Sequence, residues 1–230
     1  MISIIIPILN EAETIEELLF HLIDHSTLQH ISEIIVVDGG STDGSQEIIK
    51  NLDLKIKLLS APKGRAKQMN TGAKASRGDI LYFLHADSFP PLHFDQLIIS
   101  EVKKGNNAGC FRMKFDSSHW WLQLASWLTQ FSWRACRGGD QSQFITRALF
   151  DEIEGYDERY VIYEDNILIN ELYTRKEFVV INKQIKTSAR LYRKHGVWTL
   201  QYHFWMIYVK KWFGASADEL LAYYKKYIAS

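Results

Sequence analysis

The ten-residue stretch 79-DILYFLHADS-88 decides how the rest of the chain folds. Its apolar run, residues 80–84, ends abruptly in 85-HAD-87, and two prolines follow shortly after. An apolar run of this length between turn-forming residues is typical of a strand buried on both faces of a sheet. Its last side chains then stand at the carboxyl edge of the sheet, where open α/β folds bind ligands. His85 and Asp87 can hold a divalent metal against a phosphate there, or Asp87 simply begins a turn.

The composition is that of an ordinary soluble globular protein, with 47% hydrophobic and 23% charged residues among 230. Such a length fits one large domain or one domain with a tail. Lys plus Arg and Asp plus Glu both number 27, so no basic excess indicates a nucleic-acid partner. Cys110 and Cys136 form no disulfide framework and no metal pattern, which predicts reduced thiols in a cytoplasmic protein. We expect neither a signal peptide nor a membrane-spanning helix.

Two strand–helix–strand units are predicted ahead of the opening stretch. Residues 2–6 and 34–37 are β-branched runs typical of buried strands, and residues 55–59 form a third. Helices are predicted between them, the first capped by Asn10 and the second over residues 45–51. Successive units of this kind form a parallel, right-handed, doubly wound sheet flanked by helices.

Polar residues follow these strands at the predicted carboxyl edge. Asp38 opens the turn 38-DGGSTDG-44 after the second strand. After the third strand, a predicted helix over residues 63–75 starts with basic side chains, among them Arg65. Cations at a helix start oppose the helix dipole, so an anion bound nearby would explain them, although a solvated basic turn explains them as well.

These motifs run in an order and spacing that resembles a known family. They are Pro7 with 10-NE-11, 36-VVDGGSTDG-44, 64-GR-65 with 70-NTG-72, and 78-GD-79 with 85-HAD-87. The chain is similar to the inverting family 2 glycosyltransferases with the GT-A fold, and among them to small stand-alone bacterial members. The resemblance implies a GT-A domain over residues 1–190, with a nucleotide-binding half to about residue 105 and an acceptor half beyond it. Residues 191–230 would form an aromatic-rich helical tail.

The resemblance implies a nucleotide-sugar donor, with UDP-linked donors favoured. Asp38 would bond the base or ribose, which agrees with the ability of a carboxylate at a strand end to accept hydrogen bonds from N–H groups and ribose hydroxyls. Arg65 would approach the base or the phosphates. The other nucleotide-binding residues that the resemblance implies are Pro7, Asn10, Glu11 and Asn70.

The family's metal motif is Asp-x-Asp, and this chain carries His85-Ala86-Asp87 in its place. Asp87 matches the second acid and is the implied metal ligand, whereas His85 departs from the first. Mg²⁺ and Mn²⁺ prefer oxygen ligands and can bridge a diphosphate, and imidazole suits Mn²⁺ better than Mg²⁺. The basic segment 190-RLYRKHG-196 supplies two late candidates, His195 for the metal and Arg193 for the diphosphate.

The segment 163-YEDNILI-169 resembles the family's acidic pair at a helix start. The resemblance implies that Asp165 is the catalytic base and that Glu164 raises its pKa by like-charge repulsion. An inverting transfer needs one base to deprotonate an acceptor hydroxyl, while a metal takes the charge of the leaving diphosphate. On the residues alone, both acids simply cap a helix. Asp140 and Gln141, in a glycine-rich segment, are implied to bond donor or acceptor sugar hydroxyls, with a hairpin turn as the alternative.

All seven tryptophans lie beyond residue 119. Two aromatic stripes at helical spacing are predicted to pack on the core or on another subunit. The alternatives are an apolar ledge for a lipid-like acceptor in the first stripe and contact with the inner face of a membrane in the second. The first stripe comprises Trp120, Leu124, Trp127 and Phe131, and the second Trp198, Tyr202, Trp205, Val209 and Trp212.

Two rival functions stay open at this point. A nucleotidyltransferase of related fold would carry a glycine-rich loop with Arg and Lys after its first strand, where this chain reads 7-PILNE-11. A non-catalytic nucleotide-sugar-binding or scaffold protein would explain the missing first metal acid. The sequence names neither the sugar nor the acceptor, because pocket shape decides both.

Overall fold

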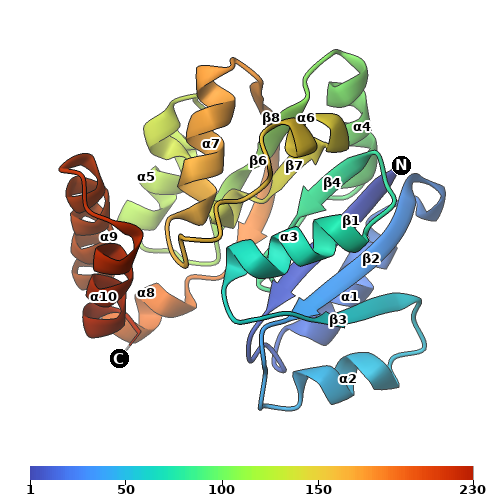
Figure 1. Ribbon diagram of the computed structural model, residues 1–230, viewed down its shortest axis with the longest axis horizontal. Coiled ribbons are helices and arrows are strands. Elements are labelled where there is room, and N and C mark those ends of the chain that lie inside the picture. Colours follow the sequence, from blue (N-terminus) through green and yellow to red (C-terminus); the bar gives the residue numbers. More distant parts are fainter. Residues whose placement is uncertain (230) are drawn as a thin grey trace.

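A computed structural model, which describes residues 1–229, shows a sheet of eight strands with helices on both faces (Figure 1). The strand order is β3-β2-β1-β4-β7-β6-β8-β5. The strands are β1 (Ile2–Ile8), β2 (Ile31–Asp38), β3 (Ile56–Ser60), β4 (Ile80–Phe83), β5 (Ser88–Phe89), β6 (Ala108–Phe115), β7 (Gln143–Thr146) and β8 (Phe178–Thr187).

The helices alternate with the strands in the first half of the chain, and in the second half all but α6 gather at one end (Figure 1). Short 3₁₀ turns cover Leu28–His30, Arg134–Cys136 and Gly139–Gln141. The α-helices are α1 (Ile15–Asp24), α2 (Ser45–Asn51), α3 (Arg65–Ala75), α4 (Phe94–Lys103), α5 (Trp120–Leu128), α6 (Arg147–Glu152), α7 (Glu164–Thr174), α8 (Arg190–His195), α9 (Val197–Trp212) and α10 (Ala217–Tyr227).

Successive side chains of β1 point into two core layers, as the period of a strand requires. Ile4 and Ile6 belong to the layer that includes α1, whereas Ile5 belongs to the layer of α3, α6 and α7. Each such residue is fully buried, which stabilises the fold by roughly 1.5–3 kcal/mol per side chain. The strand is therefore apolar throughout because both of its faces are covered.

The sheet is mostly parallel, with antiparallel pairing where β7 joins β4 to β6 and where β5 joins β8. β1 pairs in parallel with β2 and β4, and β2 with β3, as the strand–helix–strand units predict. β7 then runs antiparallel to β4, with Phe83 opposite Gln143. Because the end of β4 lies beside the start of β7, the glycine-rich segment ahead of β7 must lie at the carboxyl edge of the sheet.

The loop after β1 differs from the prediction. Asn10 does not cap a helix, since α1 begins at Ile15 and Asn10 adopts a left-handed conformation with φ of 58°. Its backbone N–H donates to Ser41 Oγ, and its side-chain oxygen accepts from the Thr42 N–H. Asn10 therefore joins the loops after β1 and β2.

The last two helices pack on each other through a small core of their own, formed by Leu200, Ile207, Leu220 and Ile228. Tyr160 and Tyr163, which precede α7, pack against this core. The second aromatic stripe faces outward and does not pack on the core, whereas packing on another subunit or contact with a membrane stays a prediction. Within residues 1–229, no helix is long and apolar enough to cross a membrane.

Candidate active site

The carboxyl ends of β1, β2 and β4 form one rim of the sheet, which the amino ends of α3 and α7 approach. This rim carries the acids that the sequence singled out. Glu11 follows β1, Asp38 ends β2 and Asp87 follows β4, while Asp165 lies in the first turn of α7. Parallel pairing of the three strands is the reason that side chains far apart in sequence meet at one edge.

His85 connects two acids of the rim. Its Nδ1 lies 3.5 Å from Asp140 Oδ1, and its Nε2 lies 3.9 Å from Asp165 Oδ2. Burial lowers the pKa of His85, but the charges of the Asp140 and Asp165 carboxylates outweigh this effect, so the pKa is raised overall. The Asp140 side chain is 54% exposed, and partial desolvation raises its pKa, but His85 and Arg65 outweigh this effect and lower the pKa overall.

Gly139 permits this approach. A Cβ atom built on Gly139 would lie 2.0 Å from Asp165 Oδ2 and 2.9 Å from His85 Cε1. No side chain fits at those distances, so the backbone of the segment before β7 packs directly against the two functional groups. Gly139 is a site residue that sequence reasoning missed, although its place in a glycine-rich segment was a signal.

Glu164 and Asp165 differ in their surroundings although they are neighbours. The Glu164 side chain is 1% exposed and lies 3.4 Å from the Arg65 guanidinium, whereas the Asp165 side chain is 12% exposed. Burial, together with the charge of Asp165, raises the pKa of Glu164 to about 7. The repulsion between these two neighbouring acids therefore contributes to the raised pKa of Glu164.

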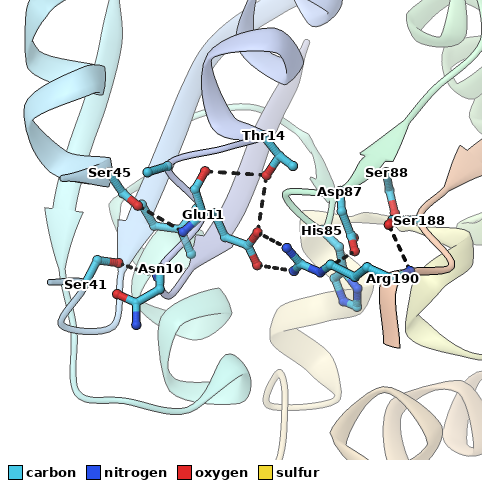
Figure 2. A network of polar contacts seen from close by, with 12 residues as sticks. Asn10, Glu11, Thr14, Ser41, Ser45, His85, Asp87, Ser88, Ser188 and Arg190 are labelled. Carbon is cyan, nitrogen blue, oxygen red and sulfur yellow. Dashed lines mark hydrogen bonds and ion pairs between the residues drawn. The ribbon is translucent and has the colours of Figure 1, made fainter. Parts of the chain in front are cut away.

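Arg190 joins two acids at the other end of the rim (Figure 2). Its guanidinium makes two hydrogen bonds to the Glu11 carboxylate, the shorter at 2.5 Å, and its Nε lies 3.6 Å from Asp87 Oδ2. Burial raises the pKa of Asp87, and the nearby Asp140 charge adds to the rise. The Arg190 guanidinium thus supplies the positive charge between the Glu11 and Asp87 carboxylates.

The donor groups of the rim fit a divalent cation only in part. Among residues 1–229, no group of three or more His, Cys, Asp or Glu side chains forms a preformed metal cage. Mg²⁺ is commonly held by one or two carboxylates together with substrate phosphates, and Asp87 fits that arrangement. Burial and the Asp140 charge both disfavour the ionised form of Asp87, and a cation bound there would offset both effects.

Asp38 builds the turn after β2. It is buried, and its carboxylate accepts hydrogen bonds from the Gly40 and Ser41 N–H groups and from Gln46 Nε2. Pro7 lies within β1 opposite Val37, one residue before the end of the strand. Pro7 and Asp38 thus lie at the carboxyl ends of β1 and β2, and Asn10 joins the loops that follow these two strands.

Four predicted site residues make contacts elsewhere. The Asn70 side-chain amide donates to the Tyr156 carbonyl and accepts from the Tyr156 N–H. Arg193 forms an ion pair with Asp116. The Gln141 side chain is buried, accepting from Arg137 and donating to a backbone carbonyl. His195 ends α8, and its buried Nε2 has no hydrogen-bond partner within the described chain. The Asn70, Gln141 and Arg193 side chains thus bond other parts of the chain, and their roles in binding nucleotide, sugar and diphosphate stay predictions.

Arg190 is the rim cation that sequence reasoning missed. It lies in the predicted basic segment, but Arg193 was chosen from that segment. The pairing of β5 with β8 decides between them, because Ser88 lies opposite Thr187 and the Ser188 N–H donates to the Asp87 carbonyl. Arg190 then follows directly beside Asp87. Such pairing between distant segments leaves no signal in the local sequence.

Known structures confirm the α/β architecture as GT-A-like. S. aureus TarS (residues 1–349) in complex with UDP has a TM-score of 0.67 at 18% identity, over 82% of this chain and 60% of that one. The mannosyltransferase PcManGT from Pyrobaculum calidifontis, in complex with GDP-Man and Mn²⁺, has a TM-score of 0.66 at 18% identity, over 100% of this chain and 64% of that one.

Curated sequences that resemble the chain are glycosyltransferases. Glycosyltransferase AglE of Haloferax volcanii is 36% identical over 39% of this chain and 31% of its own length. The undecaprenyl-phosphate 4-deoxy-4-formamido-L-arabinose transferase of Aeromonas hydrophila is 27% identical over 63% of this chain and 46% of its own length. The chain thus spans less than half of these relatives. The family model for glycosyl transferase family 2 matches residues 3–156, and the protein belongs to this family.

Proposed function

We propose that the protein transfers a sugar from a nucleotide-sugar to an acceptor hydroxyl, with inversion at the anomeric carbon and with the help of a divalent cation. One observation carries the proposal. Asp87, Asp140 and Asp165 gather around His85 at the edge of the sheet where α/β folds bind ligands. Family membership supports sugar transfer over the nucleotidyltransferase alternative.

Asp165 acts as the base in this proposal. Its side chain is partly exposed, whereas Glu164 is buried against Arg65, so only Asp165 can meet an acceptor without rearrangement. As the acceptor oxygen bonds to the anomeric carbon, the bond from that carbon to the diphosphate oxygen breaks. The acceptor proton passes to the Asp165 carboxylate, and the nucleoside diphosphate leaves with the electron pair. His85 and Gly139 hold Asp165 in place.

Asp87 is the proposed protein ligand for the cation, with the remaining ligands from the diphosphate. Mg²⁺ or Mn²⁺ bound there would neutralise charge on the leaving group. His85 acts as a pocket residue, because both its ring nitrogens face carboxylates. Arg65 and Arg190 are the guanidinium groups nearest to the acids of the rim and would hold the phosphates.

Donor and acceptor classes come from the relatives. Neighbouring structures hold UDP, UDP-GlcNAc or GDP-Man, and we favour a UDP-linked donor. Curated relatives include undecaprenyl-phosphate and dolichol-phosphate transferases, which support a lipid-linked acceptor at the cytoplasmic face of a membrane. In this proposal residues 1–190 carry the transfer, and the helices beyond them face the acceptor side.

A donor-hydrolysis screen tests the proposal. The purified protein is incubated with UDP- and GDP-sugars and Mn²⁺, and release of the nucleoside diphosphate is measured. We expect turnover with one donor, and a loss of about 10²–10⁴-fold in Asp165→Asn. Asp87→Ala should lose turnover as well, whereas Glu152→Gln, which alters an exposed pair with Arg175, should keep it. Turnover by none of the donors, or unchanged turnover in Asp165→Asn, would favour the scaffold alternative.

A further inference from the structure

Tryptophan is unusually exposed in this protein. Six of its seven tryptophans are about half exposed or more, and Trp212 reaches 83%. Tryptophan side chains are normally highly buried, and contiguous exposed apolar surface marks an interaction site. The six are Trp120, Trp127, Trp133, Trp198, Trp205 and Trp212.

Most of these side chains form one continuous surface, which we call the aromatic face. The rings of Trp120 and Trp121 lie 5.7 Å and 5.4 Å from that of Trp198, and the Trp121 ring lies 5.8 Å from that of Trp205. These contacts join α5 to α9, which lie at the same end of the molecule (Figure 1). The exposed members of the face are Trp120, Leu124 and Trp127 of α5, Trp198, Tyr202, Trp205, Val209 and Trp212 of α9, and the adjoining Phe213.

The segments that carry the aromatic face, residues 117–139 and 188–217, contain no Asp or Glu. Of their seven Lys or Arg, Arg137 is buried and Arg190 and Arg193 pair with acids of other segments, whereas Arg134 is exposed. Lys210 and Lys211 follow Val209 in α9, with their Nζ atoms over the rings of Tyr223 and Tyr160. A surface of exposed indole and phenol rings with basic neighbours matches the headgroup region of an anionic bilayer, where Trp and Tyr concentrate.

The aromatic face adjoins the rim. Tyr208 of α9 donates a hydrogen bond of 3.3 Å to Asn166 Oδ1, and its ring packs edge-on against Tyr163. Tyr163 and Asn166 flank Glu164 and Asp165 in the chain. A surface bound to the aromatic face is therefore next to the amino end of α7.

We propose that the aromatic face docks the protein on an anionic lipid bilayer, with its indole rings at the level of the headgroups. Docking is peripheral and needs neither donor nor acceptor, so it stands apart from the proposed sugar transfer. Its consequence for that reaction is positional, because the rim would open beside the headgroups, where the head of a lipid-linked substrate lies.

Co-sedimentation with vesicles tests the proposal without donor or acceptor. The native protein should bind vesicles of phosphatidylcholine and phosphatidylglycerol about tenfold more tightly than pure phosphatidylcholine, and added salt should reduce the difference. Tryptophan fluorescence should shift to the blue on binding. Trp212→Ser/Phe213→Ser removes two side chains that are 83% and 82% exposed, so folding should be preserved while binding falls about tenfold or more.

The matched control is Leu28→Ser/Leu92→Ser, which removes side chains that are 62% and 57% exposed and lie outside α5 and α9. This variant should bind vesicles like the native protein. Asp165→Asn should also bind normally, so loss of transfer with intact docking would defeat only the proposed reaction. Absence of vesicle binding overturns the docking proposal, as does equal loss in both double variants. Concentration-dependent dimerisation that Trp212→Ser/Phe213→Ser abolishes, without vesicle binding, would assign the face to a second copy instead.

Discussion

The rim and the aromatic face depart from ordinary folding rules in opposite directions. At the rim, Glu164 and His85 are withdrawn from water although both can carry charge. On the aromatic face, Trp198 and Trp212 are left in water although both are largely apolar. Burying charge and exposing apolar surface each weaken folding, so neither region is what stability alone would select. Each is explained by a binding partner: an anionic donor with its cation at the rim, and a lipid surface at the face.

The rim and the aromatic face also differ in how rigidly they are built. The rim is fixed by backbone approach at Gly139 and by ion pairs across elements, so small shifts there should matter greatly. The side chains of the aromatic face project outward and support little else. Substitutions at the rim should therefore alter chemistry sharply, whereas those on the face should alter binding and spare the fold.

The largest effect is expected from Gly139→Ala. The new Cβ would meet Asp165 Oδ2 at 2.0 Å, so Asp165 or the segment before β7 has to move. A displacement on the order of 1 Å can cost about 100-fold in rate, and donor turnover should fall by that amount. Gly138→Ala is the matched control, because a Cβ there meets nothing within 4 Å. Equal activity in the two variants would show that Asp165 does not need its observed position.

A pH effect should follow from Glu164→Gln. In the folded protein the pKa of Glu164 is raised from 4.5 to about 7, so the folded state binds the proton more strongly than the unfolded state. The native free energy of unfolding therefore falls as pH rises from about 4.5 to about 7. The free energy of unfolding of Glu164→Gln should not fall in this way. Between pH 4.5 and pH 7 it should therefore rise by roughly 1–3 kcal/mol relative to that of the native protein. Urea unfolding at several pH values measures the difference, and parallel curves would refute the raised pKa.

A smaller and more selective effect is expected from the two arginines of α8. Arg190→Ala removes the cation between Glu11 and Asp87, and UDP should bind about tenfold more weakly. Arg193→Ala breaks an exposed pair with Asp116 and two long hydrogen bonds, to the Asp116 carbonyl and to Ser188 Oγ, and should change affinity less than about twofold. Calorimetric titration of each variant with UDP measures the two affinities. The reverse order of effects would restore the sequence-based choice of Arg193.

The amino-terminal half was predictable because its signals are local. The apolar run before His85, the β-branched run before Asp38 and the helix over residues 45–51 all match observed elements within a few residues. Strand ends then locate the rim, since parallel strands place their carboxyl ends together. The family resemblance supplied Asp87 and Asp165 as candidates at that rim.

The remaining features depend on contacts between distant segments. β7 is short and follows a glycine-rich segment, so nothing local shows that it runs antiparallel to β4. The pairing of β5 with β8 selects Arg190 rather than Arg193. α9 is apolar around most of its circumference, and such a pattern does not tell which side faces the core. Leu200 and Ile207 pack inward, which leaves the tryptophan stripe outside.

The binding of UDP in the presence and absence of Mn²⁺, measured by calorimetry on the native protein and on Asp87→Ala, tests the central claim most directly. If the rim holds a nucleoside diphosphate through a cation on Asp87, Mn²⁺ should tighten UDP binding to the native protein about tenfold or more. Asp87→Ala should lose that enhancement. Equal affinity of the native protein with and without Mn²⁺, or an enhancement that survives in Asp87→Ala, would contradict the account.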